Sequence, residues 1–246
     1  MKRILVVLLA VILLAGCGAQ TREPQNGSVA PSEAVNPVAS GDVQTSTAGN
    51  ENEQASPQPA TSEEDVDNVL EKISVVAKPT LDGTFCVFIT NGSESIIDEL
   101  DIQIHYKDAQ GSIIDMDEDG HDMVLPGYTV VSRMDAPDSY VDFDTDVSIE
   151  LGVNPRYENH SEQVSISANQ GDDCVIIQIT NNSDVNIEEI EYAVVLYKGD
   201  DIVEVCYPQD VCDVGAGKTV VEKESTYRAD YDRFEVYLNQ AHTFGL

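Results

Sequence analysis

The sequence contains no tryptophan, and aromatic residues make up only 6% of the chain. Basic residues are also scarce: 13 Lys and Arg stand against 45 Asp and Glu, which gives a formal net charge of −32. A chain with this balance and without a basic stripe repels phosphate backbones, so we expect no nucleic-acid partner. The same charge makes an anionic membrane surface unattractive unless a covalent group holds the protein there.

The sequence also lacks an apolar segment long enough to span a membrane. Its longest apolar run, Ile4 to Leu14, is about half as long as the ~20 residues that a helix needs to cross the bilayer. The run follows Lys2 and Arg3 and precedes small residues, and this order predicts a signal peptide over residues 1–16. Everything after it is therefore expected to be exported.

The end of this segment, Leu14-Ala15-Gly16-Cys17, resembles the lipobox of bacterial lipoprotein signal peptides. The resemblance implies that the thiol of Cys17 receives a diacylglyceryl group and that cleavage leaves Cys17 as the new N-terminus. It further implies a partner, the cell membrane, and a location on its extracytoplasmic face. Lipidation would supply the covalent anchor that the negative charge makes necessary.

The next residues are poor in the side chains that build a core. From Gly18 to Ser62 there is no Ile, Leu, Met, Phe, Tyr or Cys, so this stretch cannot bury enough apolar surface to offset its ordering entropy. We predict that residues 17–62 are a lipidated cysteine followed by a disordered tether. The sequence SEEDVDNVLEKI that follows has a Ser cap and apolar residues at helical spacing, which predicts one short helix.

An internal repeat organises the rest of the chain. Residues 85–114 and 175–203 match in order and spacing: Thr90-Asn91 corresponds to Thr180-Asn181, and Tyr106-Lys107 to Tyr197-Lys198. The turn sequences GYTVV and GKTVV begin at residues 127 and 217. This period suits two copies of one small domain, so we predict domains over residues 63–157 and 158–246.

Within each copy the apolar residues alternate with polar ones. Leu100, Ile102 and Ile104 are separated by polar residues, and Ile190 and Tyr192 begin the same pattern in the second copy, which is typical of half-buried strands. Turn sequences such as TNGS, TNNS and LPG separate short runs of this kind. The prediction is an all-β fold: two tandem immunoglobulin-like antiparallel β-sandwiches after a disordered tether, with one short N-terminal helix.

The stretch ITNNSDVNIEEIEYAVVLYKGDDIVEV, residues 179–205, resembles the FxLYD-type β-sandwich modules found in lipoproteins of Gram-positive bacteria. Leu196 and Tyr197 match the Leu and Tyr of that signature, while Asn91-Gly92-Ser93 and Pro126-Gly127-Tyr128-Thr129 match its two turns. The resemblance covers most of residues 73–246 and implies the sandwich fold. It implies no particular activity, because one fold hosts many functions.

The cysteines other than Cys17 are Cys86, Cys174, Cys206 and Cys212, an even number for an exported protein. Cys206 and Cys212 flank YPQDV, which we interpret as a short excursion between two apolar runs, and we predict a local disulfide between them. A bond between Cys86 and Cys174 that joins the two copies is the alternative. A zinc site is disfavoured because no C-x-x-C or Cys/His spacing occurs.

Residues 115–122, DMDEDGHD, begin like a calcium loop of the form D-x-D-x-D-G. Position twelve of the loop is Pro126 where an EF-hand requires Glu, which excludes an EF-hand. Two interpretations stay open: a solvated acidic turn, or a looser calcium site in a hairpin loop. The candidate metal ligands are Asp115, Asp117 and Asp119, and Asp142, Asp144 and Asp146 could add oxygens if the fold brings them close.

No pattern in the sequence points to catalysis. The histidines show no metal-binding spacing and no nucleophile motif such as G-x-S-x-G is present, while CDVGAGKT has Cys212 where a nucleotide-binding loop needs its first glycine. We expect a non-catalytic envelope lipoprotein that acts as a binding or spacer module for an unknown envelope protein or glycan. A calcium-dependent adhesion or wall-associated protein is the alternative, and a secreted hydrolase is third.

Overall fold

The computed structural model describes residues 32–33, 66–226 and 230–245. The predicted signal peptide, Cys17 and nearly all of the predicted tether lie outside these residues. No helix among the described residues is long and apolar enough to cross a membrane.

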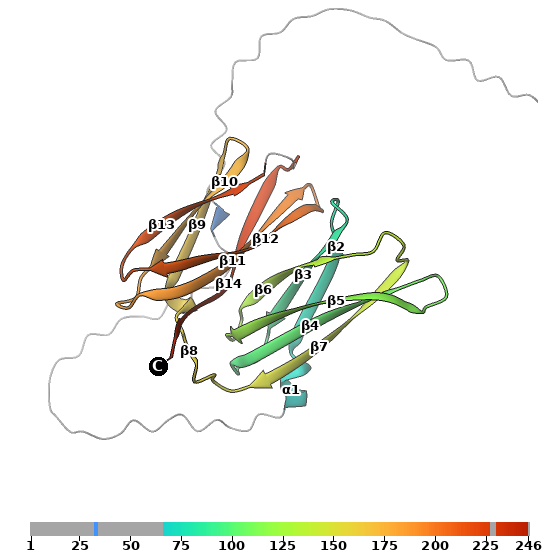
Figure 1. Cartoon of the computed structure of the whole chain (residues 1–246), viewed down its shortest axis with the longest axis horizontal. Coiled ribbons are helices and arrows are strands. Elements are labelled where there is room, and N and C mark those ends of the chain that lie inside the picture. The colour runs from blue at the N-terminus through green and yellow to red at the C-terminus, as the bar shows by residue number, and fades with distance from the viewer. Residues whose placement is uncertain (1–31, 34–65, 227–229, 246) are drawn as a thin grey trace, which may run out of the picture. The chain divides into compact units, whose positions relative to one another are not determined.

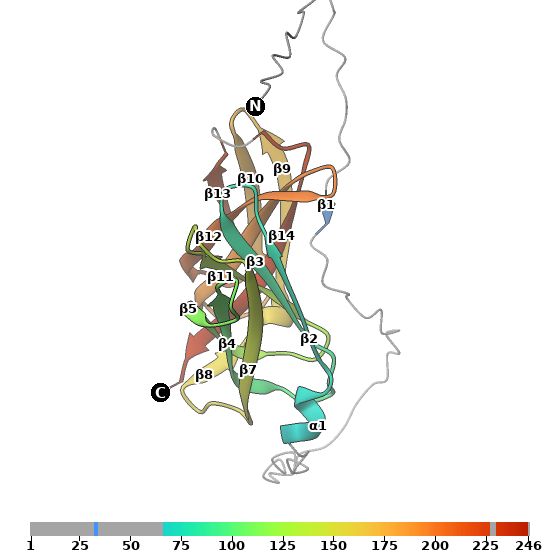
Figure 2. The ribbon, with the colours of Figure 1, turned by 90° about the vertical axis from the view of Figure 1, so that its right-hand side faces the viewer.

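The first β-sandwich consists of two three-stranded antiparallel sheets, one with the order β2-β3-β6 and the other with the order β5-β4-β7 (Figure 1). Its strands are β2 (Ile73–Pro79), β3 (Thr84–Asn91), β4 (Ile97–Lys107), β5 (Ile113–Val124), β6 (Thr129–Asp135) and β7 (Asp142–Leu151). The core between the sheets holds the inward residues of β3 and β4, such as Phe85, Leu100 and Tyr106, all fully buried. The predicted helix is present as α1 (Val66–Leu70), which precedes β2 (Figure 2). It contacts β7 and buries Val69.

The second sandwich has the same plan. Its sheets have the orders β9-β10-β13 and β12-β11-β14-β8. Its elements are β8 (Tyr157–Asn159), a 3-10 turn (Ser161–Gln163), β9 (Val164–Gly171), β10 (Cys174–Asn181), β11 (Ile187–Lys198), β12 (Asp201–Val214), β13 (Thr219–Ser225) and β14 (Arg233–Phe244). The fold class predicted from the sequence is confirmed.

One short strand falls inside the stretch that the sequence predicts to be disordered. β1 (Ser32–Glu33) pairs antiparallel with β9, opposite Ala168 and Ser167. β9 is otherwise an edge strand, and an extended segment can satisfy the free backbone groups of such an edge whatever its own side chains are.

A buried asparagine explains the strongest part of the sequence repeat. Asn91 is fully buried, and its Nδ2 donates hydrogen bonds to the carbonyl oxygens of Ser95 (2.9 Å) and Val124 (3.0 Å). Its Oδ1 accepts from the backbone N–H (3.0 Å) and the hydroxyl (2.7 Å) of Ser93. One side chain therefore ties the β3–β4 turn to the end of β5.

The second copy reproduces this arrangement. Asn181 Nδ2 donates to the carbonyl oxygens of Val185 (2.8 Å) and Val214 (2.7 Å), and its Oδ1 accepts from the N–H and hydroxyl of Ser183. The T-N-x-S sequence is thus repeated because every polar atom of a buried amide must find a partner. The adjacent threonines also pair alike, Thr90 with Thr129 and Thr180 with Thr219, each at 2.8 Å.

The two sandwiches are joined through the outer faces of two sheets, which we call the inter-sandwich contact. The outer face of sheet β2-β3-β6 packs on the outer face of sheet β12-β11-β14-β8. The apolar side chains of this contact are Cys86, Phe88, Val131, Ala193, Val195, Tyr197, Ile202, Val205 and Tyr237. Strands β3 and β11 are consequently buried on both faces along much of their length.

Hydrogen bonds accompany this packing. Asn239 on β14 pairs with both backbone groups of Val131 on β6: its Oδ1 accepts the N–H at 2.9 Å and its Nδ2 donates to the carbonyl at 3.1 Å. The β2–β3 turn adds two backbone bonds, from the N–H of Leu81 to the carbonyl of Ile202 and from the N–H of Asp82 to that of Val203. An asparagine side chain here takes the place of a neighbouring strand at the edge strand β6.

One correspondence read from the sequence is wrong in detail. Tyr106 and Tyr197 align as letters, but Tyr106 lies in the core of the first sandwich whereas Tyr197 lies in the inter-sandwich contact. In β11 the inward position equivalent to Tyr106 is Leu196. Because side chains alternate between faces along a strand, a one-residue offset sends the same residue type to the opposite side.

The buried asparagines make a prediction about stability. Replacing Asn181 with Ala leaves the carbonyls of Val185 and Val214 and the N–H of Ser183 without that partner, so the free energy of unfolding should fall by about 2–4 kcal/mol. Urea denaturation of the two proteins measures the loss. The matched control is Asn186→Ala, because Asn186 is exposed and bonds only another exposed side chain; equal effects of the two substitutions would contradict the assignment.

Candidate functional site

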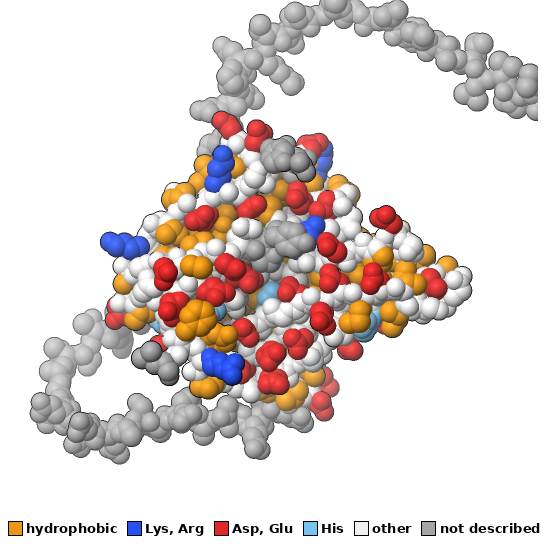
Figure 3. Space-filling view, in the orientation of Figure 1, with side chains coloured by type: hydrophobic (Ala, Val, Ile, Leu, Met, Phe, Trp, Pro, Cys, Tyr) orange, Lys and Arg blue, Asp and Glu red, His pale blue; other side chains and the backbone are white. Residues whose placement is uncertain are grey.

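The outer face of sheet β5-β4-β7 carries many carboxylates, and we call it the acidic face. Side chains at alternate positions of these strands point outward. The outward carboxylates are Glu99 and Asp101 on β4, Glu118 and Asp122 on β5, and Asp142, Asp144, Asp146 and Glu150 on β7. Figure 3 shows Asp and Glu side chains spread over the region of these strands. Among the outward positions of β4, β5 and β7, Lys107 is the one Lys or Arg.

The strand register sets these charges in rows across the sheet. Glu99 stands opposite Asp122 on one side and Glu150 on the other. The negative charges of Asp101 and Glu150 raise the pKa of the exposed Glu99 carboxyl, because each disfavours a further charge nearby. Carboxylates directly opposite one another repel, so the row costs stability and has no evident structural purpose within the sandwich.

The other end of the face has a different balance. Lys107 donates to Asp144 Oδ2 at 2.7 Å, and this bond lowers the pKa of the Asp144 carboxyl. His105 Nδ1 lies 3.6 Å from the same carboxylate. The local charge is therefore partly neutralised near the β4–β5 hairpin, while the rows of Asp101 and Glu99 are not.

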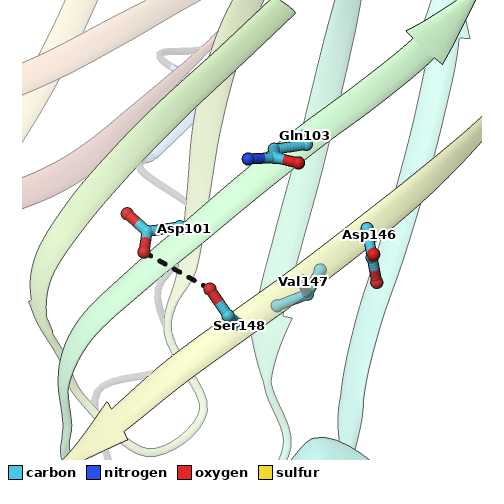
Figure 4. A pocket seen from close by; sticks show the side chains of 5 residues that line it. All are labelled: Asp101, Gln103, Asp146, Val147 and Ser148. Carbon is cyan, nitrogen blue, oxygen red and sulfur yellow. Dashed lines mark hydrogen bonds between the residues drawn. The ribbon is translucent and has the colours of Figure 1, made fainter. Parts of the chain in front are cut away.

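A shallow hollow lies in the middle of the acidic face, between β4 and β7. It is lined by Asp101, Gln103, Asp146, Val147 and Ser148 (Figure 4). Ser148 Oγ donates to Asp101 Oδ2 at 3.3 Å across the strands. On the other side of Asp101 stands Gly120, where an added Cβ would come within 3.3 Å of Asp101 Oδ1. The small residues Gly120 and Ser148 thus leave the Asp101 carboxylate accessible at the centre.

Exposed apolar side chains border the acidic face beside Lys107. We call this group the apolar end; its members are Ile113 (59% exposed), Ile114 (41%), Met116 (48%) and Val141 (66%). Met116 is the strand partner of His105, Ile113 is that of Lys107, and the N–H of Val141 donates to the carbonyl of Lys107. A contiguous group of large exposed apolar residues beside a charged surface is typical of a protein-binding surface.

Comparison of the two copies sets this face apart. At the outward positions of β4 stand Gln103 and His105, both solvent-accessible, whereas the equivalent positions of β11 hold Ala193 and Val195, both fully buried in the inter-sandwich contact. The same sheet of the same fold is therefore a protein contact in one copy and an open surface in the other. Sequence reasoning missed this difference, although AVVLY at residues 193–197 is a continuous apolar run of the kind found in strands buried on both faces.

The predicted calcium ligands lie on a strand. Asp115, Asp117 and Asp119 belong to β5, which pairs with β4 along its length, so the expectation of a turn or hairpin loop here is wrong. Next-nearest residues of a strand are about 6.6 Å apart, and three carboxylates in such a line do not surround one ion as a loop does. Alternation of Asp with other residues is as typical of a strand with a polar face as of a calcium loop.

The aspartates have a structural role that follows from this placement. β5 is an edge strand, and Asp115, Asp117 and Asp119 each accept the N–H of the next residue at 2.9–3.0 Å. Asp117 Oδ2 also accepts the N–H of Asp135 at 2.7 Å, at the end of β6 in the opposite sheet. Inward-pointing charges that occupy free backbone groups protect an edge strand from pairing with other chains.

The second group of candidate ligands lies on another surface. Asp142, Asp144 and Asp146 point outward from β7 onto the acidic face, whereas Asp115, Asp117 and Asp119 are on the inward side of the same sheet. The fold therefore does not bring the two groups together. Across the described ranges, no three His, Cys, Asp or Glu side chains are placed to hold a metal ion.

The cysteines of the described region are free thiols. Cys206 and Cys212 lie on the same strand, β12, opposite Val194 and Glu189 of β11, and neither is bonded. The expected excursion between them is a continuation of the strand with a bulge, so they are separated by about 20 Å of extended chain, and a disulfide needs Cα atoms within about 7 Å. The predicted local disulfide is therefore absent from this structure, and Cys86 and Cys174 are free as well.

Comparison with known proteins adds no family. No protein-family model matches the sequence, and no curated protein is similar enough to count as a relative.

The geometry of β5 predicts the response to calcium. Because the three aspartates are spread along a strand and already accept backbone N–H groups, we expect millimolar calcium to raise the melting temperature no more than magnesium does at equal ionic strength. Differential scanning fluorimetry with either ion, and with a chelator as reference, measures this. A calcium-specific rise that is lost in an Asp117→Asn, Asp119→Asn variant would establish the calcium site instead.

Proposed function

We propose that this protein is a non-catalytic, lipid-anchored binding module on the extracytoplasmic face of the cell membrane, with Cys17 as the lipidated residue. The support for the anchor is the sequence: a short apolar run after Lys2 and Arg3, then Leu14-Ala15-Gly16-Cys17. The residues between Cys17 and β1, which pairs with β9, then space the sandwiches from the membrane. We also propose that the two sandwiches are related to the FxLYD-type modules, because they share the turn and strand motifs described in the sequence analysis.

The binding surface in this proposal is the acidic face together with the apolar end. The observation that carries it is the contrast between the copies: one sheet is covered by protein in the second sandwich, and its equivalent in the first is open and carries uncompensated carboxylates. The rows of opposed carboxylates cost folding stability, and a partner that neutralised them would recover it.

The partner we infer is a protein surface rich in Lys and Arg around an apolar patch. Charge complementarity calls for the cations, because Lys107 is the one Lys or Arg on the outward positions of these strands and Asp144 already binds it. Met116 calls for the apolar patch, since it is exposed and stands opposite His105, on the same face as the carboxylates. A flat partner surface fits best, because the equivalent face of β11 contacts the flat face of another sheet.

The anchor is tested by Cys17→Ser. Without the thiol no thioether to lipid can form, so the variant should leave the membrane fraction and the detergent phase for the soluble phase. Phase partitioning of cells that express either protein measures the change. Continued partitioning of the variant into detergent would overturn lipidation at this residue.

The binding surface is tested by removing its charge. A triple variant, Asp101→Asn, Glu118→Gln and Asp146→Asn, should lose most of the salt-sensitive binding to basic envelope proteins that the full-length wild-type protein retains. Quantitative capture from envelope extract at low and high salt, with identification of the retained proteins, measures this. The loss expected is at least tenfold, because several close charge pairs disappear together.

A matched control removes the same charge elsewhere: Asp172→Asn, Asp184→Asn and Asp200→Asn, three exposed residues at turns of the second sandwich. Its binding should equal that of the wild type. If the two triple variants behave alike, net charge and not the acidic face governs binding, and the proposed surface is wrong.

A further inference from the structure

A carboxyl group lies within the inter-sandwich contact at the place where Asn239 meets β6. Asn239 Nδ2 donates to Glu191 Oε1 at 2.6 Å as well as to the carbonyl of Val131, and its Oδ1 accepts the N–H of Val131. Glu191 on β11 thus orients the amide that binds the edge strand of the other sandwich. The hydrogen bonds of this group of residues cross from one domain to the other.

The charges that act on Glu191 are all of its own sign. Asp210 on β12 is its strand partner, Glu189 precedes it on β11, and the negative charge of Asp119, on β5 of the first sandwich, also acts on it. On β14 its neighbours are the neutral Asn239 and Gln240. When Glu191 is ionised, Asp119 repels it across the contact; when it is protonated, this repulsion disappears.

Burial raises the pKa of Glu191 to about 7; the hydrogen bond from Asn239 opposes the rise, and Asp210, Asp119 and Glu189 add to it. In water the ordinary value is 4.5. A carboxyl with a higher pKa in the closed contact favours closure fully below pH 4.5, and this advantage is lost as the pH rises through 7.

We infer that the inter-sandwich contact is a pH-sensitive joint, closed while Glu191 is protonated and loosened when Glu191 becomes ionised beside Asp119. Opening separates the sheet faces that hold Cys86 and Val131 from those of β11 and β12, while each sandwich stays folded around its own core. The inference does not depend on the acidic face or on lipidation.

Two histidines beside the contact act in the opposite direction. His121 on β5 is buried, with its Nε2 2.8 Å from Ser132 Oγ and 3.9 Å from Asp119. His242 on β14 is also buried and lies 3.7 Å from Glu189. The other charged or titratable groups that act on His242 are Asp122, Glu188 and His160. Burial lowers the pKa of both imidazoles below 6.5. Their neutral forms favour the folded state above pH 6.5, and this contribution is lost as the pH falls. The effect of Glu191 is therefore isolated above pH 6.5.

Cys86 supplies the readout, because its thiol is fully buried in the inter-sandwich contact. The experiment measures the rate at which a thiol reagent labels Cys86 in the full chain. The quantity followed at each pH is the labelling rate of the wild type divided by that of Glu191→Gln. The ratio removes the reagent's own pH dependence, and Gln keeps an oxygen that can accept from Asn239. From pH 6.5 to 8.5 the ratio should rise by up to about fourfold, the limit set by pKa values of about 7 in the closed contact and 4.5 in the open state, because Asp210 and Glu189 stay beside Glu191 after opening.

Two controls make the result decisive. Asp101→Asn changes the residue of β4 that is equivalent to Glu191 and lies on the open acidic face. The Cys86 labelling rate of the wild type divided by that of this variant should stay constant with pH. Cys206 lies in the core of the second sandwich, so its labelling reports unfolding of that domain and should not follow Cys86. The proposed joint would be wrong if the ratio of Cys86 labelling rates between wild type and Glu191→Gln stayed constant with pH. It would also be wrong if the ratios measured at Cys86 and at Cys206 rose equally.

Discussion

The arrangement of the described chain depends on one contact, the packing of the outer face of sheet β2-β3-β6 on the outer face of sheet β12-β11-β14-β8. It buries apolar side chains of both sandwiches, including Cys86, Val195 and Tyr197. Because apolar surface is removed from water on both sides, β3 and β11 become interior strands although each belongs to a separate sandwich. The contact also decides which sheet faces remain open, and the acidic face is one of them.

The two copies share their backbone chemistry and differ on their surfaces. Asn91 and Asn181 make the same four hydrogen bonds, and each thereby ties a turn to the end of a neighbouring strand. The outward residues of the middle strands, β4 and β11, are not needed to hold such a turn. They have become apolar in β11, where the other sandwich covers them, and acidic or polar in β4, where it does not.

The excess of acidic residues serves more than one purpose. On β5 the inward aspartates accept free N–H groups of an edge strand, which satisfies the backbone and discourages pairing with other chains. On the acidic face the rows of opposed carboxylates at Glu99, Asp122 and Glu150 repel one another, and this is the physical basis for proposing a partner that neutralises them. In the inter-sandwich contact Glu191 accepts from Asn239, and the negative charge of Asp119 adds to the rise of its pKa, which is the basis of the proposed coupling between closure and protons.

The sequence by itself determined the alternating strands, the two copies and the turns, since these follow from local residue patterns and from a repeat visible in the letters. It misplaced the aspartates of residues 115–119 and the Cys206–Cys212 stretch, because strands and loops can share the same alternation. Only the tertiary structure decided that Tyr106 and Tyr197 face different surroundings, that one outer sheet face is covered and its equivalent open, and that Glu191 binds the asparagine that bonds Val131 of the other sandwich. Those outcomes depend on which faces pack together, and packing between domains joins residues that no local pattern relates.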